Sequence, residues 1–304
     1  MKFKLWTMKT KKTLVVLTTS NENLYDEKFF EPIGPNKEVL FEYNILDAIE
    51  VGFEKIILVA ANNMKEFIQN NIKPKFKNTI EIYCVYTNPM SRFNFRRTIP
   101  NAFFSLNSYA LWKTKRYIKG SFLIIDGRFY HGKNVYKKAL SFMSQGDDDI
   151  AVINCQLDKI LSRYGGVDRS VCLTKGKSDR LSRILELKKI RKQDRFIAHE
   201  DNENIDLSEK MLATTGVFCL NTSFFGAYNS ILKSYRKDKS RPDKPITIPN
   251  MINHALTNEI CNAKVLKIES KGFGINHKPD RIMAMHKIKD MIAQNSYPRR
   301  LPQL

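Results

Sequence analysis

The sequence predicts an α/β protein with a mixed, mainly parallel sheet that is flanked by helices. The first observation is the run Thr13–Leu17, because β-branched residues and leucines without polar alternation are typical of a strand buried on both faces. The second is that similar short apolar runs alternate with amphipathic segments of helical length through the first half of the chain. Strands joined by helices are parallel, and right-handed crossovers place helices on both faces of the sheet.

The elements of this first half follow in order. Strands are expected at Thr13–Leu17, Lys55–Ala60, Ile80–Tyr86, Phe122–Asp126 and Ile150–Asn154, with the first and the fourth near the middle of the sheet. Helices are expected between them, at Lys37–Val51, Met64–Asn71, Ala102–Lys119 and Lys133–Ser144. Pro32, Gly34 and Pro35 predict a rigid turn ahead of the first helix.

The second half has a different character, which predicts a more mixed sheet. Strands are expected at Gly166–Thr174, Arg180–Leu185, Leu212–Leu220, Ala263–Glu269 and Gly272–Asn276. Helices are expected at Ser223–Tyr235, Pro249–Thr257 and Lys278–Gln294. The strongly polar segment Arg191–Lys210 is expected to be a loop.

Composition narrows the class of protein. The 304 residues carry a net charge of +20, which favours attraction to polyanions such as nucleic acid or an acidic protein partner. Because the excess is spread along the chain, a lysine-rich proteome is the preferred explanation. The five cysteines are scattered and form no C-x-x-C pair, which predicts buried free thiols in a reducing, cytoplasmic setting. No apolar run approaches the ~20 residues that span a bilayer.

The loop after the first strand departs from what its position predicts. α/β proteins usually bind phosphates where a strand, a loop and a helix follow one another near the N-terminus. Glycines in such a loop let backbone N–H groups approach the anion. Here the loop, Thr18–Lys28, contains no glycine and no arginine, and it carries three carboxylates. The frame of a nucleotide-binding protein is predicted without its usual phosphate loop.

Several segments share an order along the chain that is typical of one family. They are Glu31–Glu38, Tyr117–Gly132, Tyr164–Cys172, Ile184–Ile190, Thr247–Asn253, Gly272–Asp280 and Tyr297-Pro298. In this order they resemble the sugar-1-phosphate nucleotidyltransferases, or NDP-sugar pyrophosphorylases, of which the chain looks like a divergent member. The resemblance implies a Rossmann-like, GT-A-like fold in a single nucleotidyltransferase-like domain, with a nucleotide-side half at 1–155 and a sugar-side half with a C-terminal extension at 156–304.

In that family a sugar-1-phosphate attacks the α-phosphorus of a nucleoside triphosphate and releases pyrophosphate, which requires a backbone cradle, basic side chains and Mg²⁺. The family's G-x-G-x-R loop aligns with Ser20, Glu22 and Leu24, so that both glycines and the arginine are replaced. The lysine that follows is kept as Lys28, a candidate catalytic residue. The family's G-T-x-H-A segment aligns with Leu106–Ala110, where only the alanine is kept.

The resemblance allows two interpretations of the first metal ligand. The family's aspartate aligns with Gly127, and Arg128 follows where a second acid is common. Asp126 would serve as a metal ligand if the turn shifts by one residue, although such a slip points the side chain to the other face and loss is favoured. Asp280 matches the distal acid that completes the metal site in the family.

The sugar-facing half keeps more of the family's pattern. Glu186 and Lys189 match the E-x-x-K pair that holds sugar hydroxyls and the sugar phosphate, which implies catalytic roles for them. Gly165 and Gly166 match the glycines that approach the sugar. The alternative for Glu186 and Lys189 is an ordinary charged face on an edge strand. The segment Thr215–Cys219 keeps the strand but not the family's Asn and Trp.

These observations favour a nucleotidyltransferase-like protein that lacks ordinary catalysis and that binds a sugar phosphate or serves in an assembly. The first alternative is an active, divergent transferase that uses Asp126 and Asp280 for Mg²⁺, with Lys28, Arg96 or Arg97 on the phosphates. The second is a basic adaptor for nucleic acid or an acidic partner, which depends on charge alone.

Overall fold

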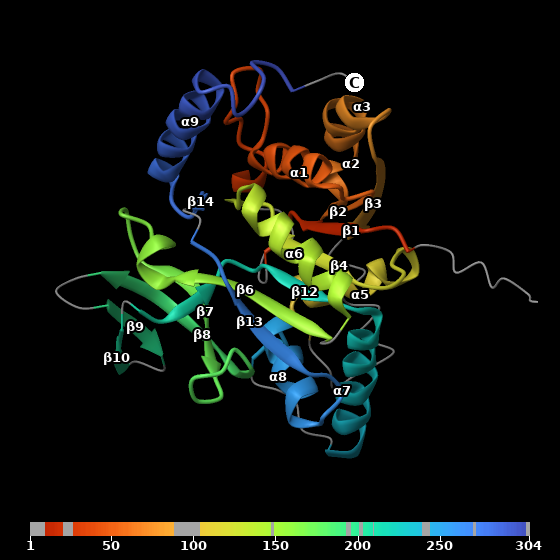
Figure 1. Cartoon of the computed structure of the whole chain (residues 1–304), viewed down its shortest axis with the longest axis vertical. Helices are drawn as coiled ribbons and strands as arrows, with labels where there is room; N and C mark the ends of the chain where they lie inside the picture. Colours follow the sequence, from red (N-terminus) through yellow and green to blue (C-terminus); the bar gives the residue numbers. More distant parts are fainter. Residues whose placement is uncertain are drawn as a thin grey trace, which may run out of the picture.

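The computed structural model describes residues 10–20, 27–87, 104–146, 149–192, 196–200, 203–208, 210–238, 244–269 and 272–301. Twelve strands form one large sheet in the order β10-β9-β8-β7-β11-β6-β12-β4-β1-β2-β3, with β13 paired to β6, and β14 and β5 form a second, small sheet (Figure 1). The strands are β1 (Thr13–Leu17), β2 (Lys55–Ala61), β3 (Glu81–Thr87), β4 (Phe122–Asp126), β5 (Phe129–Tyr130), β6 (Ile150–Gln156), β7 (Val167–Thr174), β8 (Leu181–Lys192), β9 (Phe196–Glu200), β10 (Glu203–Leu207), β11 (Leu212–Thr214), β12 (Phe218–Leu220), β13 (Ala263–Lys267) and β14 (Phe273–Gly274).

The helices cover both faces of the sheet, as predicted (Figure 1). The α-helices are α1 (Leu40–Val51), α2 (Lys65–Phe67), α3 (Lys73–Phe76), α5 (Leu106–Thr114), α6 (Lys133–Gln145), α7 (Phe225–Asp238), α8 (Ile248–Thr257) and α9 (Lys278–Ala293). Short helical turns lie at η1 (Glu27–Phe29), η2 (Asn62–Met64), η3 (Ile68–Ile72), η4 (Lys115–Tyr117), η5 (Leu157–Lys159) and η6 (Thr222–Phe224). None of the helices in these ranges is long and apolar enough to cross a membrane.

β1 and β4 were predicted near the middle of the sheet. They are interior strands, but they lie third and fourth from the edge that β3 forms. β1 pairs in parallel with β4 on one side and β2 on the other, and all five of its residues are buried. Val15 packs with α5, α7 and α8 on one face, whereas Leu14 and Val16 pack with α1 and α6 on the other. Burial on both faces explains why this strand is an unbroken apolar run.

The sheet is mixed, and the fold class is confirmed, although fewer pairings are parallel than predicted. Parallel pairs join β3 to β2, β2 to β1, β1 to β4, and β6 to β13. The pairs from β4 through β12, β6, β11, β7, β8 and β9 to β10 are antiparallel. Short connections join β7 to β8, β8 to β9 and β9 to β10, and such connections permit only antiparallel neighbours, which accounts for three of these seven pairs.

The segment Arg191–Lys210 was predicted as a loop, and this prediction is wrong. The end of β8 and the hairpin of β9 and β10 occupy it. Phe196, Ala198 and Leu207 pack into a small core between these strands. The apolar runs here are only three residues or fewer and are flanked by many charged residues, so the strand pattern is weak. Likewise, the predicted strand Leu212–Leu220 is divided into β11 and β12, which pair with the same strand, β6, on either side of a break.

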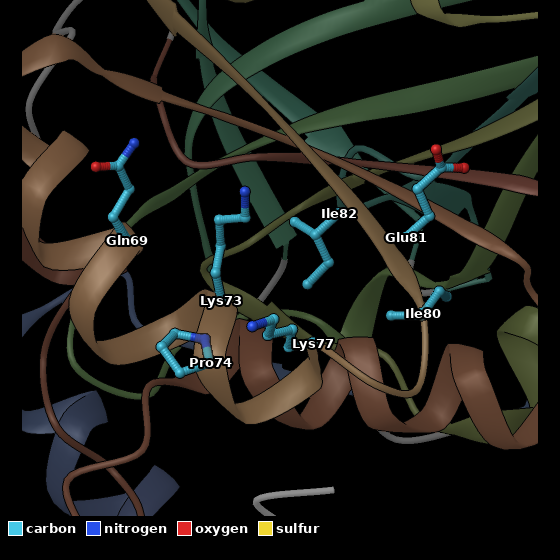
Figure 2. Close-up of a pocket in the computed structure, with 7 residues that line it drawn as sticks. All are labelled: Gln69, Lys73, Pro74, Lys77, Ile80, Glu81 and Ile82. Carbon is cyan, nitrogen blue, oxygen red and sulfur yellow. The ribbon is translucent and has the colours of Figure 1, made fainter.

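The predicted helix Met64–Asn71 is longer and less regular than expected. It runs from α2 through a π-helical turn, η3, into α3. Pro74 explains the wide turn, because proline has no N–H to donate to the carbonyl four residues earlier and its ring crowds that carbonyl. An open pocket of about 540 Å³ lies between this helix and the start of β3, and Figure 2 shows its lining residues, Gln69, Lys73, Pro74, Lys77, Ile80, Glu81 and Ile82.

A separate apolar cluster fixes the C-terminal segment. Tyr43 and Leu46 of α1 pack with Ile288 of α9 and with Tyr297 and Leu301. Figure 1 shows α9 beside α1 at one end of the molecule. The five cysteines are free, as predicted, and four of them are buried, with Cys84 half-buried.

Candidate functional site

The candidate site is built around the turn that follows β4. We call Asp126, Gly127 and Arg128 the central turn. It lies against the end of β1, because the Gly127 N–H donates to the Leu17 carbonyl at 2.9 Å. Parallel strands β1 and β4 both end here, and this edge of an open α/β sheet is where ligands usually bind.

Within the central turn, Asp126 is paired with Arg128. The Arg128 backbone N–H and Nε donate to Oδ1 of Asp126 at 2.9 and 3.2 Å, and Nη2 donates to Oδ2 at 2.8 Å. The guanidinium also lies 5.2 Å from the centre of the Phe29 ring. Both carboxylate oxygens of Asp126 are therefore engaged by one cation in a two-pronged geometry.

Gly127 stands where the family resemblance expects the metal-binding aspartate. A Cβ atom at this position would lie 3.1 Å from the Leu17 carbonyl oxygen and 3.3 Å from a methyl group of Thr18. The backbone of β1 cannot rotate away as a side chain would. A side chain at position 127 thus requires the end of β1 to move.

Arg169, which the sequence reasoning missed, is buried beside the central turn. Its Nε and Nη2 donate to the Ile160 carbonyl at 3.0 and 2.6 Å, and its guanidinium lies 4.8 Å from the centre of the Phe129 ring. Burial, and then the charge of Arg128, lower its pKa to about 10, while Asp126 acts in the opposite direction. Its position on β7 could have indicated its burial, because residues two apart on a strand share a face and its neighbours on that face are Val167 and Val171.

Asp280, the second predicted metal ligand, holds the start of α9. Its Oδ2 accepts hydrogen bonds from the backbone N–H groups of Asn276 and His277 at 2.9 and 2.8 Å. Its Oδ1 accepts from the Ser162 hydroxyl at 2.9 Å. The residue is only 1% exposed. This carboxylate is the third helical residue of a capping box, which is a structural role.

These residues do not fit a magnesium site of the family's kind. Mg²⁺ in such sites is bound through one or two carboxylates with open coordination positions. Asp126 faces a guanidinium, and Asp280 is surrounded by three donors. Within the ranges that the structure describes, no group of three or more His, Cys, Asp or Glu residues is placed to hold a metal ion.

Glu186, a residue of β8, has its carboxylate beside the N-terminus of α8. Its Oε2 accepts a hydrogen bond from the hydroxyl of Thr247, which is the N-cap of that helix. Burial raises its pKa, and hydrogen bonds from Thr247 and Asn250, together with the charge of Lys188, offset part of that rise. Sequence reasoning did not identify Thr247, Asn250 or Lys188 as neighbours of this carboxylate, because two of them lie about sixty residues away.

Lys189 is placed differently from its predicted partner. It is exposed, with φ of 50°, and its backbone N–H donates to Oδ1 of Asp168 at 2.9 Å. The pairing of β8 with β9 shifts register between Lys188 and Arg191, which marks a bulge at this point. The lysine that acts electrostatically on Glu186 is Lys188. The bulge therefore separates Lys189 from the regular alternation of the strand.

Gly165 and Gly166 allow close packing near this bulge. A Cβ atom on Gly166 would lie 2.9 Å from both Cα and O of Lys189, and one on Gly165 would lie 2.9 Å from Nε2 of His277. The same His277 nitrogen is 3.1 Å from the Gly166 carbonyl. Two glycines are needed here so that the loop before β7 can reach β8 and the start of α9. Their predicted contact with a sugar stays a prediction.

The structure describes only part of the predicted nucleotide side. Lys28 lies in η1, next to Phe29, and its side chain is half-buried. In α5, which replaces the family's G-T-x-H-A contact segment, Tyr109 is 7% exposed and packs into the core. The hydroxyl of Thr19 donates to Oδ1 of Asn107 at 2.8 Å and so ties the end of β1 to α5. Arg96, Arg97, Glu22 and Leu24 lie outside the described residues.

The sequence matches no protein-family model and no curated protein. The structure is similar to the inositol-1-phosphate CTP transferase from T. maritima, with a TM-score of 0.60 and 14% identity over 92% of this chain and 97% of that one. It is also similar to a putative glucose-1-phosphate thymidylyltransferase from Bacillus anthracis, with a TM-score of 0.58 and 11% identity over 92% of this chain and 95% of that one. A UTP-bound UGPase from Acinetobacter baumannii gives a TM-score of 0.57 and 12% identity over 95% of both chains.

The chain thus has the fold of the sugar-1-phosphate nucleotidyltransferases. The resemblance predicted from the sequence is confirmed at the level of fold.

Proposed function

We propose that this protein is a relative of the NDP-sugar pyrophosphorylases that lacks their ordinary turnover and that binds a sugar phosphate. The observation that carries the proposal is the state of Asp280. Its carboxylate is buried and accepts three hydrogen bonds that hold the start of α9. Three donors occupy three of its roughly four acceptor positions, so binding Mg²⁺ through this carboxylate would require part of the network to open, at a cost of about 1–3 kcal/mol for each buried donor left unpaired. Metal-assisted attack on a triphosphate is disfavoured by that cost.

The sugar side supports the binding half of the proposal. Glu186 presents a carboxylate that accepts from hydroxyl groups, as it already does from Thr247. Lys188 acts electrostatically on Glu186, and Lys189 is exposed on the adjacent bulge. A carboxylate next to ammonium groups suits a ligand that carries both hydroxyls and a phosphate. The similar structures include an inositol-1-phosphate CTP transferase and a putative glucose-1-phosphate thymidylyltransferase, which suggest cyclic polyol or sugar monophosphates as the ligand class.

Calorimetry tests the binding half. Glucose-1-phosphate and inositol-1-phosphate are titrated into the protein in the presence of EDTA, and weak binding is expected. Glu186→Ala and Lys189→Ala are each expected to abolish the heat. Lys177→Ala, which removes an equal charge from an exposed turn between β7 and β8, is the matched control and should bind as the wild type does. Equal silence from all four proteins toward a broad set of sugar phosphates would show that the pair is only a solvated charged face.

A pyrophosphate-release assay tests the catalytic half. Nucleoside triphosphates and sugar-1-phosphates are supplied with Mg²⁺, and no release above background is expected. Asp280→Asn keeps an acceptor oxygen for the helix cap while it removes the carboxylate charge, so it separates the two roles of this residue. Turnover in the wild type that disappears in Asp280→Asn would establish the active, divergent transferase instead.

A further inference from the structure

The central turn contains a cation supplied by the chain itself. We infer that the Arg128 guanidinium occupies both oxygens of the Asp126 carboxylate, through which a divalent metal would otherwise bind, so that the central turn does not hold a metal. The inference concerns the same site as the proposed function, but it does not depend on whether a sugar phosphate binds.

The first support is the geometry of the pair. Nε and Nη2 of Arg128 reach the two oxygens of Asp126 at 3.2 and 2.8 Å, and the Arg128 backbone N–H adds a third donor at 2.9 Å. The side chain of Asp126 is only 16% exposed and that of Arg128 25%, so water competes weakly for the carboxylate. A two-pronged pair of neighbouring residues is favourable because little chain entropy is lost in forming it. A metal would have to displace this guanidinium.

The second support is that the turn leaves no other place for a metal-binding carboxylate. Position 127 is crowded by the Leu17 carbonyl oxygen, 3.1 Å from where a Cβ would stand, so that a side chain there requires this backbone to move by a few tenths of an ångström. Position 128 is the arginine itself. The resemblance places acids at both positions in the family, and this chain has replaced one by the smallest residue and the other by the opposite charge.

The third support is the charge of the surroundings. Arg169 is buried beside the turn, with its guanidinium 4.8 Å from the centre of the ring of Phe129, the residue that follows Arg128. A second guanidinium therefore lies near the central turn. A divalent ion brought to Asp126 would be repelled by both guanidiniums. A phosphate at the same place would instead meet positive charge.

Manganese binding tests the inference without turnover or a sugar ligand. Mn²⁺ is titrated into the full-length protein, and the free ion is followed by electron paramagnetic resonance. The wild type should show no saturable site. Arg128→Asp removes the cation and supplies a second carboxylate to the turn, and it should bind one Mn²⁺ at concentrations at least about tenfold below those at which the wild type shows any binding. Arg183→Asp makes the same change on an exposed position of β8 and is the matched control, which should stay like the wild type.

Two results would overturn the inference. One is a stoichiometric Mn²⁺ site in the wild type that Asp126→Asn removes, because the guanidinium would then yield to the metal. The other is a folded Arg128→Asp protein that binds Mn²⁺ no better than Arg183→Asp. If Arg128→Asp does not fold, Arg128→Gln removes the charge alone and should still give measurable Mn²⁺ binding that Asp126→Asn abolishes in the double variant. Its silence would count equally against the inference.

Discussion

Asp47→Asn should change how the stability of this protein depends on pH. Asp47 is buried in α1, where Oδ1 accepts from the Tyr297 hydroxyl at 2.7 Å and Oδ2 has no hydrogen-bond partner among the described residues. Burial raises its pKa from 3.8 to about 6, although the Tyr297 hydrogen bond opposes that rise. The folded state thus holds a proton that the unfolded chain releases. This contribution to stability is fully present below the unfolded pKa and is lost as pH rises through the folded pKa.

The size of the effect follows from the separation of the two pKa values. A difference of about 2 units corresponds to about 3 kcal/mol at high pH, of which about 2 kcal/mol develops between pH 4.5 and pH 8. Asparagine cannot ionise, and its amide oxygen still accepts from Tyr297. Its NH₂ group has no partner, which lowers stability by about 1–3 kcal/mol at every pH. The difference in unfolding free energy, variant minus wild type, should therefore shift by about 2 kcal/mol in favour of the variant across this range.

Urea denaturation at a series of pH values measures that difference. Glu42, whose pKa burial raises to about 7, titrates in both proteins and cancels in the subtraction. Tyr297→Phe removes the hydrogen bond that opposes the rise of the Asp47 pKa. The stability of this variant should therefore fall more between pH 4.5 and pH 8 than the stability of the wild type does. A difference between Asp47→Asn and wild type that stays constant from pH 4.5 to pH 8 would refute the reasoning, since Asp47 would then titrate alike in both states.

Three further substitutions test the packing around the site by thermal or urea unfolding. Gly166→Ala should destabilise the fold by about 1–3 kcal/mol, because its Cβ would meet the Lys189 backbone at 2.9 Å, whereas Gly226→Ala in α7, with its nearest atom 4.0 Å away, should be neutral or stabilising by about 0.5 kcal/mol. Equal effects of the two would contradict the close approach. Arg169→Gln should cost about 1–3 kcal/mol, because the buried Ile160 carbonyl loses its donor, and an unchanged melting temperature would show that water replaces the guanidinium. Asp280→Ala should lower stability by about 1–3 kcal/mol and Asp280→Asn by less, and equal losses would argue against capping.

The sequence pattern predicted most accurately the strands that are buried on both faces. β1 and β4 have the predicted bounds, because strands covered on both faces leave unbroken apolar runs. The hairpin of β9 and β10 was missed because its apolar residues are few and lie in a segment rich in charged residues. The π-helical turn before Pro74 depends on a local steric conflict that periodicity does not report.

Within the candidate site, the sequence indicated proximity only for residues that are close together along the chain. Asp126 and Arg128 are two residues apart, so their proximity was visible, although their pairing was not inferred. The contacts of Asp280 with Ser162 and of Glu186 with Thr247 join segments 118 and 61 residues apart. Only the folded chain brings such segments together, and a motif that names the residues does not reveal which of them are occupied by structural hydrogen bonds.

The anchoring of the C-terminal segment on α1 has a kinetic consequence. Tyr297 and Asp47 are separated by 250 residues, and Tyr297 also packs edge-on against Tyr43 at 5.1 Å between ring centres. Contacts between such distant parts of a chain form slowly, because a long loop must be closed before any of them is gained. During synthesis, α1 emerges early with its face toward α9 uncovered. The apolar face around Tyr43 and Leu46 must therefore wait, exposed to other chains, until the ribosome has released residues near 300.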